Sequence, residues 1–112
     1  NMITGEAYGS AYVFMNSKSI GADMVYAWTD AKVGAMDSTL AAKILYPEAG
    51  AEELKEKASD YEKLQSSVAA AAARGYVDRI IDPADSRKYL VAAFEMLYTK
   101  YVNEPEKKHG TK

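Results

Sequence analysis

The first apolar positions of the chain change from the spacing of a strand to the spacing of a helix. Met2–Thr4 is a short apolar entry that stops at Gly5, which is typical of a strand followed by a turn. Ser10 is a suitable N-cap for a helix that Gly21 would end. Four residues between them share the i, i+3, i+4, i+7 spacing of one helical face: Ala11, Phe14, Met15 and Lys18. The pattern predicts a strand, a turn and a short helix.

Three later stretches have the composition of strands. Met24–Trp28 is rich in β-branched and aromatic residues, pauses at Thr29–Asp30 and resumes over residues 31–36. We expect two strands joined by a tight connection. Much further along, Tyr76–Ile81 has a similar composition and predicts another short strand.

A short helix is expected after the second of these strands. Asp37 or Ser38 can cap its first turn, and Pro47 with Gly50 brings it to an end. Its apolar positions are Leu40, Ala41, Ile44 and Leu45. The spacing therefore predicts a helix that reaches Leu45.

A longer helix is predicted over residues 52–67. Its apolar face consists of Leu54, Ala58, Tyr61 and Leu64. Glu53 and Lys57 form a favourably ordered i, i+4 pair. The alanines of 69–73 continue a helix whose small side chains permit close backbone approach, until Gly75 stops it.

The last helix is expected to start at Asp82-Pro83. Its apolar stripe comprises Leu90, Ala93, Phe94, Leu97, Tyr98 and Tyr101. So continuous a stripe is expected to dock on a partner surface. We place the domain over residues 1–102, and we expect the polar tail of 103–112 to be mobile unless a partner subunit holds it, because it offers little to bury.

Composition and charge exclude several classes of function. With 112 residues, 14 basic against 16 acidic side chains and a net charge of -2, the chain is one domain or part of one and lacks the basic surface that nucleic acid requires. It has no cysteine and one histidine, so neither a metal site nor thiol chemistry is expected, and the default location is cytoplasmic. The longest apolar run, Val68–Ala73, is too short for membrane insertion. The first residues do not resemble a signal peptide, and the chain reads as cut from something longer.

The strongest candidate chemistry lies at the start of the first helix. A strand, then Gly9, then a helix beginning at Ser10 or Ala11 presents unpaired backbone N–H groups at the positive end of a helix dipole. Such an end can hold an anion or stabilise an oxyanion. The alternative is that Gly9 only turns the chain and that solvent satisfies these donors.

The remaining candidates have structural explanations. His109 lies in the polar tail, where a solvated side chain explains it better than a catalytic base. Asp82 and Asp85 could form an acid/base pair, but a helix start accounts for both. Trp28, together with the nine tyrosines, could stack on a ligand, although core or interface positions are commoner for aromatic residues. Three tail lysines could meet the phosphates of a ligand or simply be solvated: Lys107, Lys108 and Lys112.

Six spaced motifs extend over nearly the whole chain. They are Tyr8–Tyr12, Ser17–Asp23, Ala27–Trp28, Arg74–Asp78, Pro83–Arg87 and Lys107–Gly110. In this order they resemble the C-terminal half of the carboxyltransferase subunit of biotin-dependent acyl-CoA carboxylases and decarboxylases, a branch of the crotonase superfamily. The match of six motifs in order is much more specific than any one of them.

The resemblance implies an α/β fold, part of a crotonase-like core of β-β-α units with C-terminal helices. It implies a carboxyl group moved between an acyl-CoA and biotin through backbone oxyanion holes, without a metal. The backbone N–H groups of Ser10 and Ala11 would serve biotin, and Gly9, Tyr12 and Val13 would bind substrate. The implied cofactor and substrate are biotin on a carrier protein and a coenzyme A thioester, and the implied partners are the biotin carboxyl carrier protein and further copies of the chain in a homo-oligomer.

Three departures from the family pattern affect these expectations. Ser10 replaces the second glycine of the turn, Thr29 replaces a proline, and Asp37-Ser38 replaces a glycine-rich stretch. A serine at a positive φ would be strained, so we expect helical geometry at Ser10. Relatives vary between acidic and apolar residues at the position of Val13, and valine is compatible with a short acyl chain.

Two rival functions remain open on the sequence. The first is another crotonase-type acyl-CoA enzyme, such as a hydratase or a decarboxylase, since the strand, glycine turn and helix serve all of them. The second is a non-catalytic interaction module that binds through the helices of 52–67 and 86–101. Because the 112 residues contain no second glycine-led oxyanion turn, we expect this piece to be inactive alone. Because the stripe of the last helix is uncovered and the N-terminus reads as truncated, we also expect the piece to self-associate.

Overall fold

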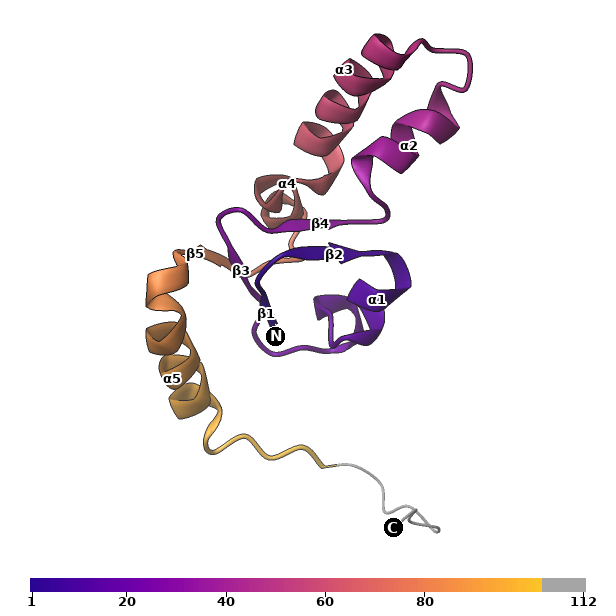
Figure 1. Ribbon diagram of the computed structural model, residues 1–112. Helices are drawn as coiled ribbons and strands as arrows, with labels where there is room; N and C mark the ends of the chain where they lie inside the picture. Colours follow the sequence, from indigo (N-terminus) through magenta and orange to yellow (C-terminus); the bar gives the residue numbers. More distant parts are fainter. Residues whose placement is uncertain (104–112) are drawn as a thin grey trace.

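Five short strands form two small parallel sheets in the computed structural model, which describes residues 1–103. One sheet has the order β1 (Met2–Ile3), β3 (Tyr26–Trp28), β5 (Arg79–Ile81), and the other pairs β2 (Glu6–Tyr8) with β4 (Lys32–Gly34). The chain passes from the first sheet to the second between β1 and β2, and again between β3 and β4 (Figure 1). The chain thus winds as a superhelix. Its first two turns each add one strand to each sheet before a helix follows, and the third adds β5 to the first sheet alone.

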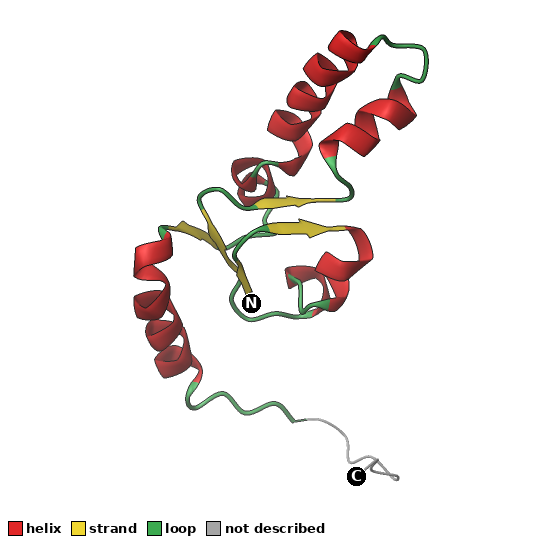
Figure 2. Ribbon diagram, in the orientation of Figure 1, coloured by secondary structure: helices red, strands yellow, loops and turns green. Residues whose placement is uncertain are grey.

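Helices surround and extend these sheets (Figure 2). They are α1 (Gly9–Phe14), η1 (Lys18–Ile20), α2 (Ser38–Leu45), α3 (Ala51–Tyr61), η2 (Glu62–Ser66), α4 (Val68–Ala73), η3 (Pro83–Asp85) and α5 (Ser86–Leu97). The hairpin of α2 and α3 projects from one side of the sheets, and α5 projects from another (Figure 1). The arrangement is the repeated β-β-α plan that the sequence motifs implied. None of the helices in residues 1–103 is long and apolar enough to span a bilayer.

The core consists almost entirely of small side chains. Its main cluster contains Ile3, Ala22, Val25, Ala27, Ala31, Val33, Val68, Ala71 and Val77. Small residues let α4 approach the sheets closely, and Ala71 of the alanine-rich segment is 1% exposed against them. The close approach predicted for these alanines is confirmed on this face of α4.

A second, smaller cluster attaches α5 to the first sheet. Tyr26 packs against Tyr89 with ring centroids 5.7 Å apart, and Ile81 and Ala93 are buried beside them. Trp28 contacts both clusters, and its indole N–H donates to the Ser86 hydroxyl at 2.8 Å. Trp28 therefore joins β3 to the start of α5, in agreement with its interpretation as a structural residue.

The start of the first helix is as expected except for its cap. Tyr8 is the N-cap, and α1 begins at Gly9, so the prediction of Ser10 as N-cap is wrong. Ser10 has helical geometry, because the positive φ at this turn falls on Gly9. The helix ends at Phe14, earlier than predicted, since Asn16 takes a left-handed conformation (φ 65°) and the following residues form η1.

The predicted helix over residues 52–73 is interrupted. A turn of π-helix, η2, follows α3, and Ser67 then adopts an extended conformation with ψ 146°. The Ser67 hydroxyl accepts from the backbone of Ala70 at 3.2 Å and caps a new helix, α4. The serine hydroxyl offers the backbone an alternative to helical bonding, which the apolar spacing does not reveal.

The end of α4 matches the prediction. Gly75 has φ 82° and follows the C-cap residue Arg74. The backbone of Gly75 donates to Ala72, and that of Tyr76 donates to Ala71, which is the bonding of a Schellman motif. A glycine is required there because this termination needs a left-handed residue.

Side-chain pairing and capping were predicted with mixed success. Asp37 caps α2 and Asp82 caps η3, as expected. The expected ion pair of Glu53 with Lys57 is not formed among residues 1–103; instead Lys57 lies 5.3 Å from the centre of the Tyr46 ring. The ring of Tyr46, at the end of α2, thus takes the place of the Glu53 carboxylate as the partner of Lys57.

The apolar stripe of the last helix is covered only in part within residues 1–103. Ala93 of the stripe is buried in the second cluster, with Tyr89 packed beside it. Phe94 is 71% exposed and Tyr98 is 88% exposed. The docking predicted for the stripe is therefore made at Ala93 and not at Phe94 or Tyr98 within the described part of the chain. The tail from residue 104, with its lysines and His109, lies outside the described residues.

Asp78 connects three segments of the superhelix. Its carboxylate accepts from Lys18 Nζ at 2.8 Å and from the Val25 backbone N–H at 2.7 Å, and its own N–H donates to the Val25 carbonyl at 2.9 Å. Burial acts to raise the pKa of this carboxyl, but the hydrogen bonds from Lys18 and Val25 outweigh that effect and lower the pKa below its ordinary value. The ionised carboxylate therefore stabilises the folded chain.

We predict that Asp78→Asn lowers the free energy of unfolding at neutral pH by about 1 kcal/mol, because the side chains of the pair are one-third exposed. The folded-state pKa lies below the unfolded one, so the stabilisation is complete above about pH 5 and is lost as pH falls through the folded-state pKa. Urea unfolding of both proteins at a series of pH values measures this. A difference that does not narrow in acid would contradict the assignment.

Gly34 permits a close contact between β4 and the end of η2. A Cβ placed on Gly34 would lie 3.0 Å from the Ser66 hydroxyl oxygen and 3.5 Å from the Ser66 Cα. Ser66 is fully buried, and its hydroxyl has no hydrogen-bond partner among the described residues. The contact is therefore steric, and a larger residue at position 34 would displace Ser66.

We predict that Gly34→Ala destabilises the protein by roughly 1–3 kcal/mol through overpacking. Ser66→Ala should change stability by less than about 1 kcal/mol, since the hydroxyl that it removes is unpaired. In the double variant the closest remaining contact is ordinary, so most of the loss should be recovered. Urea unfolding of the four proteins tests this, and additive losses would show that Ser66 is not the obstructing residue.

Candidate functional site

The turn between β2 and α1 leaves two backbone donors free. Gly9 takes φ 58°, which turns the extended chain of β2 directly into the first turn of α1. The N–H groups of Ser10 and Ala11 lie in that first turn, where a helix supplies no acceptor. Neither group donates in any hydrogen bond formed within residues 1–103. Both are therefore available to a ligand.

Gly9 is also the closest point between this turn and β4. A Cβ at Gly9 would lie 3.2 Å from the Ala35 carbonyl oxygen. The position therefore needs glycine for its left-handed backbone and for its lack of a side chain. The parallel pairing of Tyr8 with Gly34 brings the two strand ends together at this edge.

A cavity of about 480 Å³ opens beside the turn. Three of the residues predicted to bind substrate line it: Gly9, Tyr12 and Val13. Ala11 lines a neighbouring hollow of about 320 Å³, to which Tyr12 also contributes. The structure thus brings Gly9, Tyr12 and Val13 to one cavity and places Ala11 on the adjacent one, while Ser10 lines neither.

The opposite wall of the cavity comes from a distant part of the sequence. It includes Tyr61, Gln65, Arg74 and Tyr76, from the end of α3, from η2 and from the end of α4. Sequence analysis assigned no site role to these four residues. Arg74 and Tyr76 do belong to the Arg74–Asp78 motif, which was the available signal; Tyr61 and Gln65 carried none, because they reach the cavity only through tertiary packing.

Tyr12 supplies the cavity with a buried phenol. Its hydroxyl is buried and has no hydrogen-bond partner among the described residues. Burial, with a smaller contribution from Tyr76, raises the pKa of Tyr12 above its ordinary value. The phenol is therefore protonated at neutral pH, and its oxygen lies beneath the surface of the cavity rather than on it.

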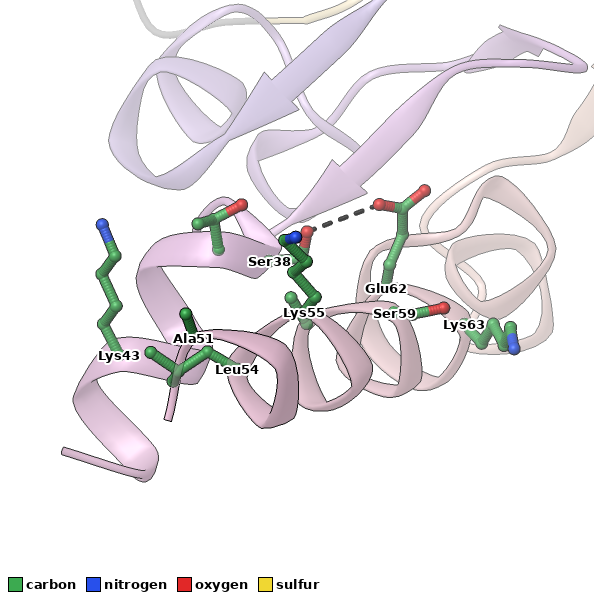
Figure 3. A pocket seen from close by; sticks show the side chains of 10 residues that line it. Ser38, Lys43, Ala51, Leu54, Lys55, Ser59, Glu62 and Lys63 are labelled. Carbon is green, nitrogen blue, oxygen red and sulfur yellow. Dashed lines mark hydrogen bonds between the residues drawn. The ribbon is translucent and has the colours of Figure 1, made fainter. Parts of the chain in front are cut away.

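A second pocket, of about 540 Å³, lies between α2 and α3 (Figure 3). Its surface combines apolar residues with Lys43, Lys55 and Lys63. Glu62 accepts from the Ser38 hydroxyl at 3.4 Å, the bond drawn in Figure 3, and from Lys32 Nζ at 3.1 Å. Glu62 is thus engaged in the joint between the hairpin and β4, and the pocket holds none of the predicted site residues.

The chemistry available at the first cavity is that of neutral donors and one cation. No group of three or more metal-ligating side chains occurs within residues 1–103. The cavity lining contains no carboxylate, and it includes Gly9, which directly precedes Ser10 and Ala11 in the chain. Such a site is suited to binding an oxyanion.

The sequence as a whole matches a family model. The model described as "Carboxyl transferase domain" matches residues 1–111. The chain belongs to this carboxyl transferase domain family. It is 47% identical to a putative propionyl-CoA carboxylase beta chain of Bacillus subtilis over 97% of the chain and 23% of that relative. It is 37% identical to the methylmalonyl-CoA carboxyltransferase 12S subunit of Propionibacterium freudenreichii subsp. shermanii, over 97% of the chain and 22% of that subunit.

Solved structures agree in fold. The chain superimposes with a TM-score of 0.89 on a transcarboxylase 12S structure that has hydrolysed methylmalonyl-coenzyme A bound. The two sequences are 38% identical, and the match covers 98% of this chain and 22% of that one. The geranyl-CoA carboxylase beta subunit of P. aeruginosa gives 0.73 at 22% identity, over 87% and 20%, a likeness of fold. The chain thus spans little more than a fifth of the relatives that it matches, and the α/β crotonase-like fold is confirmed.

We predict that Gly9→Ala lowers the free energy of unfolding by about 1–2 kcal/mol, because alanine is strained at a positive φ and its Cβ would crowd the Ala35 carbonyl. Gly5→Ala is the matched control. No atom lies within 4 Å of a Cβ at Gly5, so its effect should stay within about 0.5 kcal/mol. Chemical unfolding measures both, and equal losses would show that the turn at Gly9 is not specially constrained.

Proposed function

We propose that these residues work within a longer acyl-CoA carboxyltransferase that is biotin-dependent, and that the turn at Gly9 serves biotin. The family, the relatives that act on propionyl-CoA or methylmalonyl-CoA, and their greater length support the proposal. The observation that carries it is the pair of unengaged N–H groups at Ser10 and Ala11, beside a cavity without carboxylates.

The reaction moves a carboxyl group between N1 of biotin and the α-carbon of an acyl thioester. When carboxylated biotin supplies the group, its N1–C bond breaks and negative charge moves to the ureido oxygen. The α-carbon of the acyl thioester loses a proton, which N1 of biotin takes up, and forms the new C–C bond to the released carboxyl group. The N–H groups of Ser10 and Ala11 donate to the ureido oxygen. They are fixed by the backbone before the charge develops, so no reorganisation is needed, and one such donor contributes roughly 3 kcal/mol.

The cavity side chains shape the space beside these donors. The Tyr12 side chain lines the cavity and would border the bound ureido or acyl group, while its hydroxyl lies buried behind that surface. Val13 presents an apolar side chain to the same cavity, which suits a short acyl chain better than a polar one. Gly9 lets the backbone approach without obstruction. This donor set fits a bound ureido ring without the involvement of a metal.

The proposal includes two partners. One is the biotin carboxyl carrier protein, which would deliver biotin to the cavity. The other is a second copy of the chain in a homo-oligomer; the transcarboxylase 12S subunit is described as a hexamer, and the exposed apolar residues of α5 offer this chain a surface to bury. The two halves of one reaction site would then come from different copies.

We predict that Ala11→Pro, made in the complete subunit, reduces kcat for carboxyl transfer by roughly 10²–10³-fold, because it removes one donor to the developing oxyanion. Position 11 lies in the first turn, where the lost N–H carries no helical hydrogen bond, so the fold should be kept. The assay follows transfer of labelled carboxyl from the biotin carrier to propionyl-CoA, with the melting temperature measured in parallel.

Two variants serve as controls. Ser10→Ala and Ala11→Gly keep both N–H groups, and each should retain kcat within a few-fold of the parent. A proline variant that keeps the parent's rate would contradict the role given to the amide. Acyl-CoA chemistry without biotin would favour a hydratase or a cofactor-free decarboxylase, and a parent subunit that neither transfers carboxyl groups nor acts on acyl-CoA would favour the interaction module.

A further inference from the structure

The cavity beside Gly9 carries a single formal charge. Of the residues that line it, Arg74 alone is ionised at neutral pH, and the rest are apolar, hydroxyl or amide side chains and backbone. Lys32, the lysine of β4, forms an ion pair with Glu62 at the base of the hairpin. The cavity is therefore a cationic compartment without an internal counter-ion.

Arg74 is held in place without being neutralised. Its guanidinium donates from Nη1 to the Gln65 carbonyl at 3.1 Å and from Nη2 to the Leu64 carbonyl at 2.7 Å. Both acceptors are neutral, and Arg74 takes part in no salt bridge within residues 1–103. Of the five N–H groups of a guanidinium, these two are used and three remain. A positioned cation with free donors is an anion receptor.

The backbone conformation at the end of α4 fixes the point from which the Arg74 side chain extends. Arg74 is the C-cap of α4, and the left-handed Gly75 that follows it turns the chain back at once. Tyr76, which follows Gly75, lines the same cavity as Arg74. Tyr12 and Gly9 line it too, so residues from the start of α1 and from the end of α4 border one space.

A carboxylate is the ligand that this combination selects. A guanidinium binds the two oxygens of a planar carboxylate through parallel N–H donors. The absence of acidic residues from the lining removes the repulsion that would otherwise oppose such an anion. The backbone donors at Ser10 and Ala11 are suited to a single oxyanion, so the carboxylate requires a binding group of its own.

We propose that Arg74 binds the carboxylate in transit, in the cavity that Gly9 also lines, and so selects the carboxylated form of the substrate over the uncarboxylated form. This inference rests on the proposed carboxyltransferase function. The carboxylate is carried either by the acyl-CoA, as in methylmalonyl-CoA, or by biotin, and both present the same group to the guanidinium. Arg74 touches the substrate and alters its affinity; the developing charge on the ureido oxygen is left to the backbone donors.

The first experiment compares two thioesters that differ by one carboxylate. Dissociation constants for methylmalonyl-CoA and propionyl-CoA are measured by calorimetry with the complete subunit and with its Arg74→Gln variant. We expect the variant to bind methylmalonyl-CoA roughly 10- to 100-fold more weakly and propionyl-CoA with unchanged affinity. A purely structural role for Arg74 would weaken both ligands alike, so equal losses would overturn the proposal.

The second experiment identifies the carrier of the carboxylate. KM for the carboxylated biotin carrier and KM for methylmalonyl-CoA are measured in the two directions of the reaction. A rise confined to methylmalonyl-CoA in Arg74→Gln supports the proposal and assigns the carboxylate to the acyl group, and a rise confined to the carrier supports it and assigns the carboxylate to biotin. A fall in kcat with neither KM changed would overturn it.

Two further variants separate charge from folding. Arg74→Lys keeps the charge but loses the planar fork, so it should retain the preference for methylmalonyl-CoA with less than about a tenfold loss. If Arg74→Gln fails to assemble, the affinities of Arg74→Lys test the proposal in its place. An equal loss of affinity for both thioesters in Arg74→Lys would again overturn the proposal. Lys63→Gln removes one positive charge from the other pocket and should leave both affinities unchanged. A parent subunit without carboxyl transfer would refute the proposed function instead.

Discussion

The pairing of Tyr8 with Gly34 in the β2–β4 ladder is the constraint on which the site depends. This register places the end of one strand against the end of the next, so that Gly9 lies against the Ala35 carbonyl while Gly34 lies against Ser66. Both contacts leave no room for a Cβ. The oxyanion turn and the wall formed by η2 are therefore held at fixed positions by two glycines in neighbouring turns of the superhelix.

Side-chain hydrogen bonds compensate for the shortness of the strands. Strands of two or three residues offer few ladder bonds, and the core of alanine and valine buries little area per residue. Asp78 joins the start of β3 to the start of β5, and Trp28 joins the end of β3 to the start of α5. The superhelix is thus fixed at its corners, where the chain changes sheet or enters a helix, as much as along its strands.

Local signals in the sequence predicted the elements that depend on local chemistry. The left-handed Gly75, the cap at Asp82 and the glycine turn before α1 were all predicted, because each is set by residues within one turn of the chain. The motif order also indicated the fold and the family, and the family match extends to residue 111. The free amides at Ser10 and Ala11 follow from the same local geometry.

Features that depend on tertiary packing were not predictable in this way. Apolar spacing continued through Ser67, whereas the structure interrupts the helix there, with the buried Ser66 packed on β4. Tyr61 and Gln65, which precede that interruption, line the cavity together with residues far away in the sequence. The stripe of the last helix was assigned correctly as apolar, but spacing alone does not say what surface, if any, would cover Phe94 and Tyr98.

The hairpin of α2 and α3 leaves the superhelix and returns to it at nearly the same place, since Ser38 at its beginning bonds to Glu62 just after its end. Its two arms pack chiefly on each other, away from the sheets (Figure 1). Extra helical turns added to both arms would extend the tip outward and leave this junction undisturbed. The connection is consequently a place where evolution can insert or delete residues freely, while the strand register on either side, and the chemistry that it positions, are inherited unchanged.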